Sequence, residues 1–231
     1  MKAIILAAGK GERLGSITRE IPKPMVSIYG KPILEHNIIL LEKYGITDIY
    51  INLHHLPEII TDYFGSGSKW GVNIKYKYEE ELLGTAGTVK NFSNNLDDTF
   101  IVLYGDNLFN SSTNIKSFIE FSLLKNSDFS IGLCVAEDIS LSGAVDINGD
   151  QRVIRLIEKQ KTIEPISGWV NAGIYIMKPH LIDFISEEIS DFSYDLIPFL
   201  IDSDYNVFGH KLEEQVIAID TPTLLNKANK L

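Results

Sequence analysis

The segment over residues 2–25 constrains the fold of this chain more than any other part of the sequence. Residues 2–8 (KAIILAA) form a short apolar run, which predicts a strand buried on both faces of a parallel sheet. Gly9 and Gly11 follow directly. Glycine adopts backbone angles that let consecutive N–H groups curve around an anion. The sequence therefore predicts a buried strand that runs into a phosphate-binding loop.

The charges of this loop suit a bound polyphosphate. The Arg13 guanidinium is a fork that matches phosphate oxygens, and Lys23, between two prolines, adds a compact charge on a stiff piece of chain. Residues 10–31 carry five cations and only two carboxylates, in a protein of net charge −10. Taken alone, the segment fits a charged surface turn equally well. Other parts of the sequence are needed to distinguish a phosphate-binding loop from a surface turn.

Two other glycine-rich phosphate loops do not match these residues. The P-loop requires Gly, four residues, then Gly-Lys-Ser/Thr, and the sequence contains no such string. The dinucleotide fingerprint requires a third glycine at position 14, where the chain has Leu14. That fingerprint also opens directly into a helix, whereas the two prolines in residues 16–25 predict extended chain. Both common nucleotide folds are therefore disfavoured.

Composition narrows the class of protein and of partner. A chain of 231 residues with 45% hydrophobic content is expected to form one domain with a solid core. The charge of −10 argues against nucleic acid or an anionic membrane as main partner. Cys134 is the sole cysteine, which excludes a disulfide within the chain and predicts a buried thiol. Without a signal-like start or an apolar run of about 18 residues, we expect a soluble cytoplasmic protein.

Strand and helix patterns alternate in the first part of the chain, which predicts a parallel sheet covered by helices. The expected strands are 2–8, 48–52, 73–78 and 100–104, and the expected helices are 32–44, 57–64, 85–95 and 114–125. Beyond residue 129, strands joined by hairpins are expected, and Asn148-Gly149 is a hairpin signal between 143–147 and 153–157. A strand over 169–177, helices over 179–189 and 194–201, short strands over 206–211 and 215–219, and a helix after Thr221 complete the pattern.

Two aspartates follow predicted strands. Asp106 comes after the apolar strand 100–104, and Asp220 comes after the strand that ends near Ile219. In open α/β sheets, ligands lie beyond the carboxyl ends of strands. Magnesium typically takes one or two carboxylates and completes its shell with water and substrate phosphates. Each aspartate alone fits a turn or a helix cap, but beside a phosphate loop the pair predicts a Mg²⁺ site.

Seven motifs in order make the chain resemble the sugar-1-phosphate nucleotidyltransferases over nearly its whole length. The motifs are residues 6–14 (LAAGKGERL) with 22–25 (PKPM), 31–34 (KPIL), 79–87 (EEELLGTAG), 105–106 (GD), 143–145 (GAV) with 148–149 (NG) and 158–159 (EK), 171–175 (NAGIY) and 220–222 (DTP). The LGTAG segment, which lacks a glutamine, is closest to that of mannose- or heptose-1-phosphate guanylyltransferases.

This resemblance implies a Rossmann-like three-layer αβα fold with a mostly parallel, mixed central sheet and a smaller, β-hairpin-containing part that binds the sugar. It implies a single domain over 1–231, with about 1–128 binding the nucleotide and about 129–231 binding the sugar phosphate. The implied reaction is attack of a sugar 1-phosphate oxygen on the α-phosphorus of a nucleoside triphosphate, GTP being favoured. The nucleophile is already anionic, so no general base is required.

The resemblance also implies roles for individual residues. Arg13, Lys23 and Asp106 are the expected catalytic residues, with Arg13 on the pyrophosphate, Lys23 on the α-phosphate, and Asp106 and Asp220 on Mg²⁺. The expected nucleotide-binding residues are Leu6, Ala7, Ala8, Gly9, Gly11, Arg13, Lys23, Glu79, Gly84, Thr85 and Asp106. The expected sugar-phosphate-binding residues are Asn107, Gly143, Glu158, Lys159, Asn171 and Asp220.

Some positions depart from the commonest family patterns, and other functions stay open. Glu12 stands where threonine is frequent, Leu82 and Gln160 stand where proline is usual, and the residues around Asp220 lack a glycine. The alternatives are uridylyl or cytidylyl transfer to another phosphorylated acceptor, and a non-catalytic regulatory subunit that binds a nucleotide sugar. The chain ends at Leu231, so we expect no appended C-terminal domain. The expected partners are the two substrates, and the oligomeric state is left open, a homo-oligomer included.

Overall fold

The computed structural model describes residues 1–109, 113–139, 143–157, 166–213 and 215–230. These residues form two compact units that interleave along the chain. Unit 1 comprises residues 1–82, 102–113 and 216–231, and unit 2 comprises 83–101 and 114–215. Among the described residues, no helix combines the length and the apolar character needed to cross a membrane.

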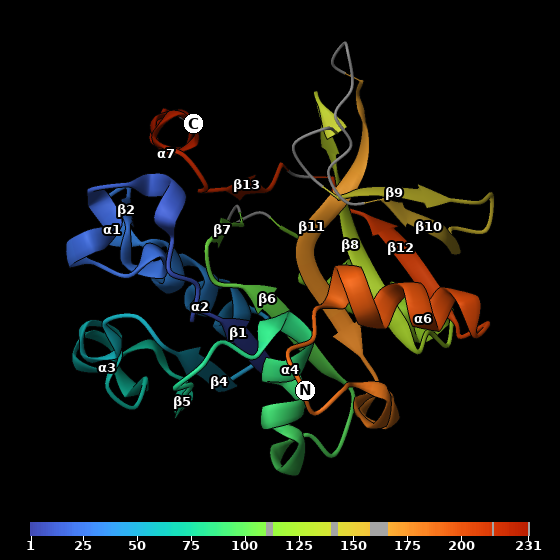
Figure 1. The fold of residues 1–231 in the computed structure, drawn as a ribbon, viewed down its shortest axis with the longest axis horizontal. Helices are drawn as coiled ribbons and strands as arrows, with labels where there is room; N and C mark the ends of the chain where they lie inside the picture. The colour runs from blue at the N-terminus through green and yellow to red at the C-terminus, as the bar shows by residue number, and fades with distance from the viewer. Residues whose placement is uncertain (110–112, 140–142, 158–165, 214, 231) are drawn as a thin grey trace. The chain divides into compact units, whose positions relative to one another are not determined.

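Unit 1 is built on strands that lie side by side in the order β6-β1-β4-β5 (Figure 1). Their bounds are Lys2–Leu6 for β1, Asp48–Leu53 for β4, Asn73–Tyr78 for β5 and Phe100–Tyr104 for β6, of which Val102 onward lies in this unit. β1 pairs with β4, and β4 with β5, in parallel. Ala3, Ile4 and Ile5 are fully buried, which confirms the interior strand predicted from the apolar run.

Helices and short ladders complete unit 1. The helices are α1 (Ile17–Glu20), α2 (Ile33–Lys43), α3 (Pro57–Phe64) and α7 (Pro222–Ala228), with 3₁₀ turns at Glu12–Leu14, Lys23–Met25 and Ser68–Trp70. The short strands are β2 (Ser27–Ile28) paired with β3 (Lys31–Pro32), and β7 (Asn107–Leu108) paired with β13 (Ile217–Ala218), both antiparallel. The helix predicted after Thr221 is α7, and Thr221 caps it by accepting a hydrogen bond from the backbone N–H of Leu224.

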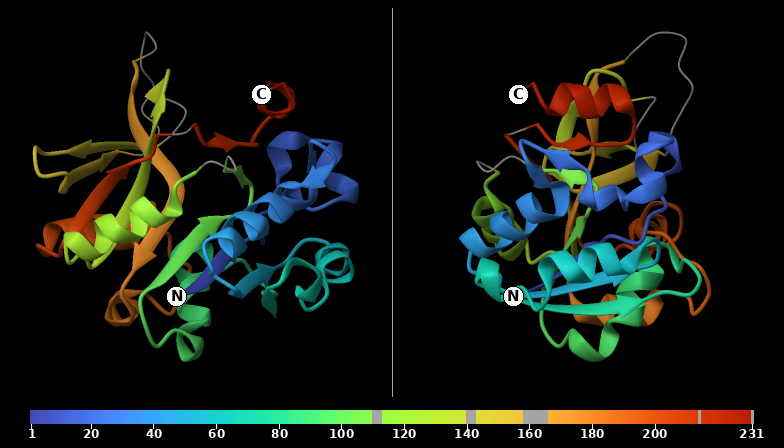
Figure 2. Two further views of the ribbon diagram at one scale, coloured as in Figure 1. Left: turned by 180° about the vertical axis from the view of Figure 1, so that it is seen from behind. Right: turned by 90° about the vertical axis from the view of Figure 1, so that its left-hand side faces the viewer.

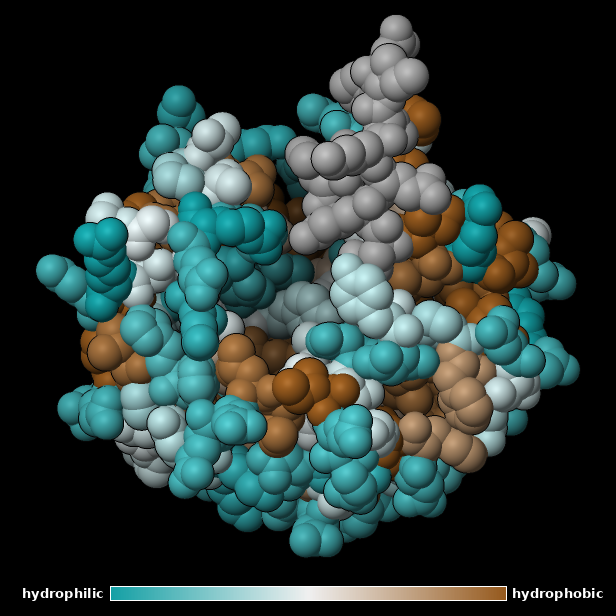
Figure 3. Space-filling model, viewed as in Figure 1, coloured by the Kyte–Doolittle hydropathy of each residue, from teal (hydrophilic) through white to brown (hydrophobic). Residues whose placement is uncertain are grey.

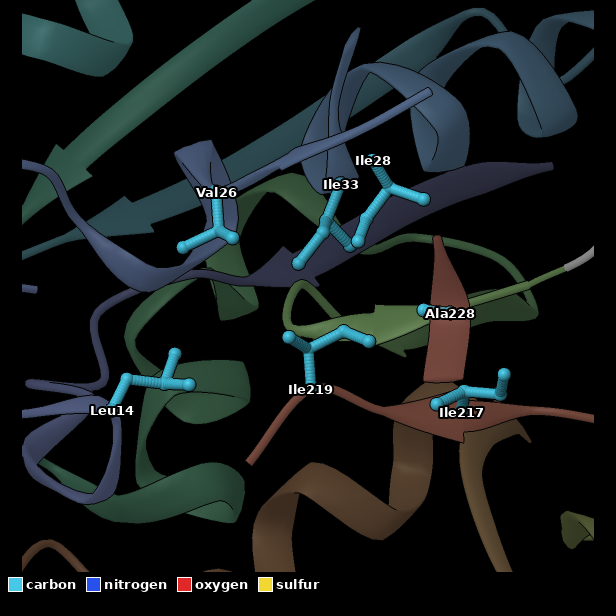
Figure 4. Packing of buried hydrophobic residues seen from close by; sticks show 7 residues of the cluster. All are labelled: Leu14, Val26, Ile28, Ile33, Ile217, Ile219 and Ala228. Carbon is cyan, nitrogen blue, oxygen red and sulfur yellow. The ribbon is translucent and has the colours of Figure 1, made fainter. Parts of the chain in front are cut away.

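A buried apolar cluster joins the glycine-loop region of unit 1 to the C-terminal segment (Figure 4). Its members are Leu14, Val26, Ile28, Ile33, Ile217, Ile219 and Ala228. Leu14 follows Arg13, Val26 lies three residues after Lys23, and Ile219 precedes Asp220. Burying this cluster therefore brings three charged side chains, far apart in sequence, to one place, and each fully buried aliphatic side chain contributes about 1.5–3 kcal/mol.

Unit 2 contains a second group of strands, which Figure 2 shows from two further directions. They are β8 (Phe129–Ala136), β9 (Ala144–Ile147), β10 (Val153–Ile157), β11 (Gly168–Met177) and β12 (Val207–Lys211). β11 pairs antiparallel with β8 and β9, β9 pairs antiparallel with β10, and β12 runs parallel to β8. The β9–β10 hairpin predicted from Asn148-Gly149 is present, and the Asn148 side chain accepts hydrogen bonds from the N–H groups of Asp150 and Arg152.

The helical segments of unit 2 differ in part from the sequence pattern. They are α4 (Gly84–Asn91), α5 (Ile115–Leu124) and α6 (Ile197–Asp202), with 3₁₀ turns at Ser93–Asn95 and Pro179–Phe184 and a π turn at Phe192–Leu196. The helix expected over 179–189 is therefore wrong, and the helix expected from residue 194 begins only at Ile197. Parallel strands in unit 1 and a hairpin-rich group in unit 2 fit the α/β class with a mixed sheet.

Candidate functional site

The candidate site lies in unit 1, beyond the ends of its parallel strands. Gly105 follows β6, and its N–H donates to the Leu6 carbonyl of β1 at 2.9 Å. A Cβ at position 105 would lie 2.9 Å from that same carbonyl oxygen, so only glycine allows this close approach. The next residue, Asp106, is thereby held beside the end of β1.

A two-residue ladder brings Asp220 to Asp106. β7 and β13 pair antiparallel with Asn107 opposite Ala218, and the Ile219 N–H donates to the Asp106 carbonyl at 3.1 Å. Asp106 therefore lies across from the Ile219–Asp220 end of the C-terminal segment. Asn107, an expected sugar-binding residue, is buried, and its carbonyl accepts a hydrogen bond from the Asn37 side chain.

The structure brings Lys23 between these two aspartates. The Lys23 ammonium donates to Asp106 Oδ2 and, at 2.5 Å, to Asp220 Oδ1. The lysine is 5% exposed, in a segment where Pro22 and Pro24 fix the backbone. Arg13 Nη2 donates to the same Asp220 oxygen at 2.8 Å. The residues expected to act on phosphate and on metal thus meet in one network of two cations and two carboxylates.

The two carboxylates fit a magnesium ion. Both are oxygen donors that converge on a single cationic atom, the Lys23 ammonium, so their arrangement already favours a cation between them. Among the residues that the structure describes, no group of three or more His, Cys, Asp or Glu side chains could hold a metal ion. Magnesium is usually bound by one or two carboxylates and keeps its other positions for water and phosphate. Asp106 and Asp220 match that donor set.

The glycine loop is folded tightly against Lys23. Gly11 has φ of 66°, and a Cβ there would lie 2.9 Å from both Lys23 Cβ and Thr18 Cγ2. The Thr18 hydroxyl donates to the Gly11 carbonyl at 2.9 Å, and His55 Nε2 lies 2.8 Å from the Thr18 carbonyl oxygen. A Cβ at Gly9 would meet open space, so in this structure steric crowding requires glycine at position 11 alone of the two.

Asn52, whose side-chain amide is buried at the start of the loop, was not predicted as a site residue from the sequence. Asn52, in β4, accepts a hydrogen bond from the Ala7 N–H through Oδ1 at 2.7 Å. Its Nδ2 donates to Glu79 Oε1 at 3.0 Å, and Asn52 and Glu79 are each 3% exposed. Glu79, an expected nucleotide-binding residue, therefore points its carboxylate at Asn52. The one signal in the sequence was an asparagine at the end of the strand predicted over residues 48–52.

Gly84 and Thr85, expected at the nucleobase, lie at the start of α4 in unit 2. Gly84 has φ of 77°, and a Cβ there would overlap the Ser190 carbonyl. The Thr85 N–H and hydroxyl both donate to Asp191 Oδ1 at 3.0 Å, and the Phe192 N–H donates to the Thr85 hydroxyl. The glycine is thus needed for close packing of α4 on the 190–192 segment.

The described residues of the expected sugar site are also in unit 2. The Asn171 N–H donates to the Gly143 carbonyl at 2.9 Å, so these two residues lie together. The Asn171 side chain donates to the Tyr175 hydroxyl at 2.6 Å and accepts from the Gly173 N–H, where the β11–β8 register shifts. Glu158 and Lys159 lie outside the described residues. A cavity of about 750 Å³ in the same unit is lined by residues that include Ala144, Asp146, Gly168, Trp169 and Lys211.

The face of the molecule drawn in Figure 3 is largely hydrophilic. In the view of Figure 3, hydrophilic side chains cover much of the surface and apolar ones appear in separate patches. At the end of the glycine loop, Lys23 and Arg13 are paired with Asp106 and Asp220, so two positive and two negative charges balance within this cluster.

Comparison with known proteins gives a consistent result. A protein-family model described as "Nucleotidyl transferase" matches residues 2–215. The chain is 37% identical to a UTP–glucose-1-phosphate uridylyltransferase from Synechocystis sp., over 95% of this chain and 60% of the relative. It is 34% identical to a D-glycero-α-D-manno-heptose 1-phosphate guanylyltransferase from Aneurinibacillus thermoaerophilus, over 84% of this chain and 82% of the relative. The chain thus spans about three fifths of the uridylyltransferase's length.

Among solved structures, HddC from Yersinia pseudotuberculosis is similar to this chain throughout. The TM-score is 0.85 at 30% identity, over 99% of this chain and 98% of HddC. A structure of HddC complexed with GMP-PN gives a TM-score of 0.82. A structure described as a "Putative Glucose-1-Phosphate Thymidylyltransferase" from Bacillus anthracis gives a TM-score of 0.88 at 25% identity, over 100% of this chain and 94% of that one. This likeness confirms the α/β class with a mixed, mostly parallel central sheet.

Proposed function

The chain belongs to the nucleotidyl transferase family, and we propose that it transfers a nucleotidyl group from a nucleoside triphosphate to a sugar 1-phosphate. The observation that carries this proposal is the convergence of Arg13 and Lys23 on Asp106 and Asp220 at the end of the glycine loop. A protein that only senses a nucleotide sugar needs neither a cation for departing pyrophosphate nor paired carboxylates for a metal.

The proposed reaction needs charge neutralisation and alignment more than proton transfer. An oxygen of the sugar 1-phosphate attacks the α-phosphorus, and the bond from the α-phosphorus to the pyrophosphate oxygen breaks in line with it. The attacking oxygen is already anionic at neutral pH, so no side chain has to remove a proton from it. Holding two polyanions in this geometry is the main task of the site.

Each charged residue has a place in that task. Lys23 would neutralise charge on the α-phosphate, and Arg13, whose side chain is 59% exposed, would extend toward the departing pyrophosphate. Asp106 and Asp220 would hold Mg²⁺. When bound, the ion would offset phosphate charge and orient the triphosphate.

We propose GTP as the preferred nucleotide, with UTP as the alternative. The support for GTP is the LGTAG segment at 83–87, the heptose 1-phosphate guanylyltransferase relative, and the likeness to HddC, which has been solved with GMP-PN. The support for UTP is the 37% identity to the Synechocystis uridylyltransferase. The proposal also includes contacts to the base from Gly84 and Thr85, and contacts to the sugar phosphate from Asn107, Gly143, Glu158, Lys159 and Asn171. It further includes the division into a nucleotide half of about 1–128 and a sugar half of about 129–231.

A matrix of nucleoside triphosphates against sugar 1-phosphates tests the reaction class. With Mg²⁺ present, we expect pyrophosphate release for at least one pair, and faster release with GTP than with UTP. Release with no pair would contradict the enzymatic function and favour the regulatory subunit. A clear preference for UTP would overturn the nucleotide choice and keep the reaction.

Asp106→Asn tests the metal site. We expect pyrophosphate release to fall by about three orders of magnitude, because a metal ion stabilises transition-state charge by several kcal/mol. The variant should stay folded, since the amide preserves the shape and Asp220 remains paired with Lys23. Asp62→Asn, at an exposed position of α3, is the matched control and should leave turnover unchanged. Unchanged turnover in Asp106→Asn would remove this residue from the mechanism.

A further inference from the structure

We propose that Asn52 is a positioning residue for nucleotide binding, which fixes the start of the glycine loop by linking the Ala7 backbone to the Glu79 carboxylate. The inference rests on the proposed function, because it concerns the loop that would hold the triphosphate. Asn52 is placed to do this by the register of three neighbouring strands, and its amide group meets two different chemical demands at once.

The first demand comes from the point where β1 leaves the sheet. Asn52 lies opposite Leu6 in the parallel ladder of β1 and β4, and Leu6 is the last residue of β1. The next N–H, that of Ala7, is buried and donates to Asn52 Oδ1 at 2.7 Å. The Asn52 side-chain carbonyl thus takes the place of a backbone carbonyl in the β1–β4 ladder. The chain can therefore leave the sheet toward Gly9 while the buried Ala7 N–H keeps a hydrogen-bond acceptor.

The second demand comes from β5. Glu79 follows this strand, and its N–H donates to the Leu53 carbonyl at 2.8 Å, which holds it beside the end of β4. Its carboxylate is buried and accepts from Asn52 Nδ2 at 3.0 Å. A buried carboxylate requires donors, and the Asn52 amide is one of them.

Only an amide of this length satisfies both neighbours. A carboxylate at position 52 accepts from Ala7, but it can donate to Glu79 only if the pair takes up a proton, which costs free energy at neutral pH. Leucine keeps the approximate volume and offers neither group. On this view Glu79 affects the nucleotide through Asn52 and the loop, by holding the amide in the orientation that Ala7 requires.

The test compares Asn52→Asp with the double variant Asn52→Asp, Glu79→Gln. In the double variant the amide introduced at 79 donates to the carboxylate introduced at 52, whose remaining lone pairs accept from Ala7. Both hydrogen bonds are thus restored, and only the direction of the bond between positions 52 and 79 is reversed. We measure dissociation constants for GTP and UTP with Mg²⁺ by calorimetry, without sugar 1-phosphate. Asn52→Asp should weaken binding of the better nucleotide by about 10- to 100-fold, and the double variant should recover to within about threefold of wild type.

A matched control lies at the other end of the same strand pair. Asn73 Nδ2 donates to Asp48 Oδ1 at 3.1 Å where β4 and β5 begin, and this pair is exposed. Asn73→Asp also sets two carboxylates against each other, and it should leave nucleotide affinity unchanged. Hydrogen exchange of residues 7–11 should speed up in Asn52→Asp and stay at the wild-type rate in Asn73→Asp.

The single variant Glu79→Gln distinguishes a Glu79 that supports Asn52 from a Glu79 that contacts the nucleobase. Glutamine keeps an acceptor for Asn52 Nδ2, so this variant should fold even where Asn52→Asp does not. We expect the ratio of the GTP and UTP dissociation constants to match that of wild type, whatever the change in the two constants themselves. A changed ratio means that Glu79 contacts the base and overturns the inference, as does a double variant that folds and fails to recover. Wild type that binds nucleotide and releases no pyrophosphate contradicts the proposed function alone, whereas wild type that binds neither nucleotide overturns both.

Discussion

Replacing Lys23 by methionine tests whether its ammonium holds the two aspartates together. Methionine keeps a long apolar stem and removes the charge. Both carboxylate oxygens lie within hydrogen-bond distance of one Nζ atom, so they are at most about 6 Å apart. Two unit charges at that distance repel by about 3 kcal/mol at an effective dielectric constant of 20. The aspartate side chains are 31% and 23% exposed and Arg13 stays on Asp220, so we expect a loss of about 2 kcal/mol.

Thermal unfolding with and without Mg²⁺ measures this loss. For a chain of this size about 2 kcal/mol lowers the melting temperature by about 4–8 °C. Added Mg²⁺ should stabilise Lys23→Met more than wild type, because in wild type the ion has to displace the ammonium first. Lys116→Met is the control, since Lys116 pairs with Glu120 at 3.7 Å on the exposed face of α5 and should contribute under about 0.5 kcal/mol.

Two results would refute this reasoning. If Lys23→Met melts within about 1 °C of wild type, the ammonium does not relieve repulsion between Asp106 and Asp220. If Mg²⁺ raises the melting temperature of both proteins equally, the metal and the ammonium do not compete for the same carboxylates. High salt should reduce the difference between variant and wild type, since it screens the partly exposed charges.

Two further predictions concern unit 2. Gly84→Ala should destabilise the protein by about 2–3 kcal/mol in urea unfolding, because φ at Gly84 is 77° and the new Cβ overlaps the Ser190 carbonyl. Gly149→Ala is the control and should cost under about 1 kcal/mol, because a Cβ there meets open space. Burial lowers the pKa of His210, so the unfolded state takes up a proton near pH 6.5 that the folded state does not. Wild-type stability should therefore decline as pH falls below 6.5, and His210→Phe should flatten that decline; an unchanged slope in the variant would assign the decline to other groups.

The parts of the site that lie along continuous chain were readable from the sequence. An apolar run followed by glycines and cations predicted the β1 strand and its loop, because strand burial and loop charge are local patterns. Gly105 and Asp106 were readable for the same reason, as a turn after an apolar strand. The convergence of Lys23 with Asp220 was expected only through the resemblance, since it depends on the two-residue β7–β13 ladder, which is too short to leave a periodic signal.

Tertiary contacts explain where the helix pattern failed. The 194–201 pattern predicted a helix, but Phe192–Leu196 forms a π turn and α6 begins at Ile197. Just before this turn, the Asp191 side chain and the Phe192 N–H are bound to Thr85 at the start of α4. These hydrogen bonds fix the backbone at a position set by another helix, so local propensity did not decide where α6 begins.

Asn52 was missed for a related reason. The role of an asparagine in an apolar strand can be recognised only once the neighbouring strand is known. β4 lies beside β1 because of the sheet order, and the two strands are far apart in sequence. Contacts between segments far apart in sequence also determine how the site would respond to a metal ion. Because the Lys23 ammonium occupies the position between Asp106 and Asp220, a divalent cation there and the ammonium exclude each other. Seating the metal would therefore release the Lys23 charge to a phosphate, while the Ala7 end of the loop stays fixed by Asn52, so metal and nucleotide binding should be thermodynamically coupled.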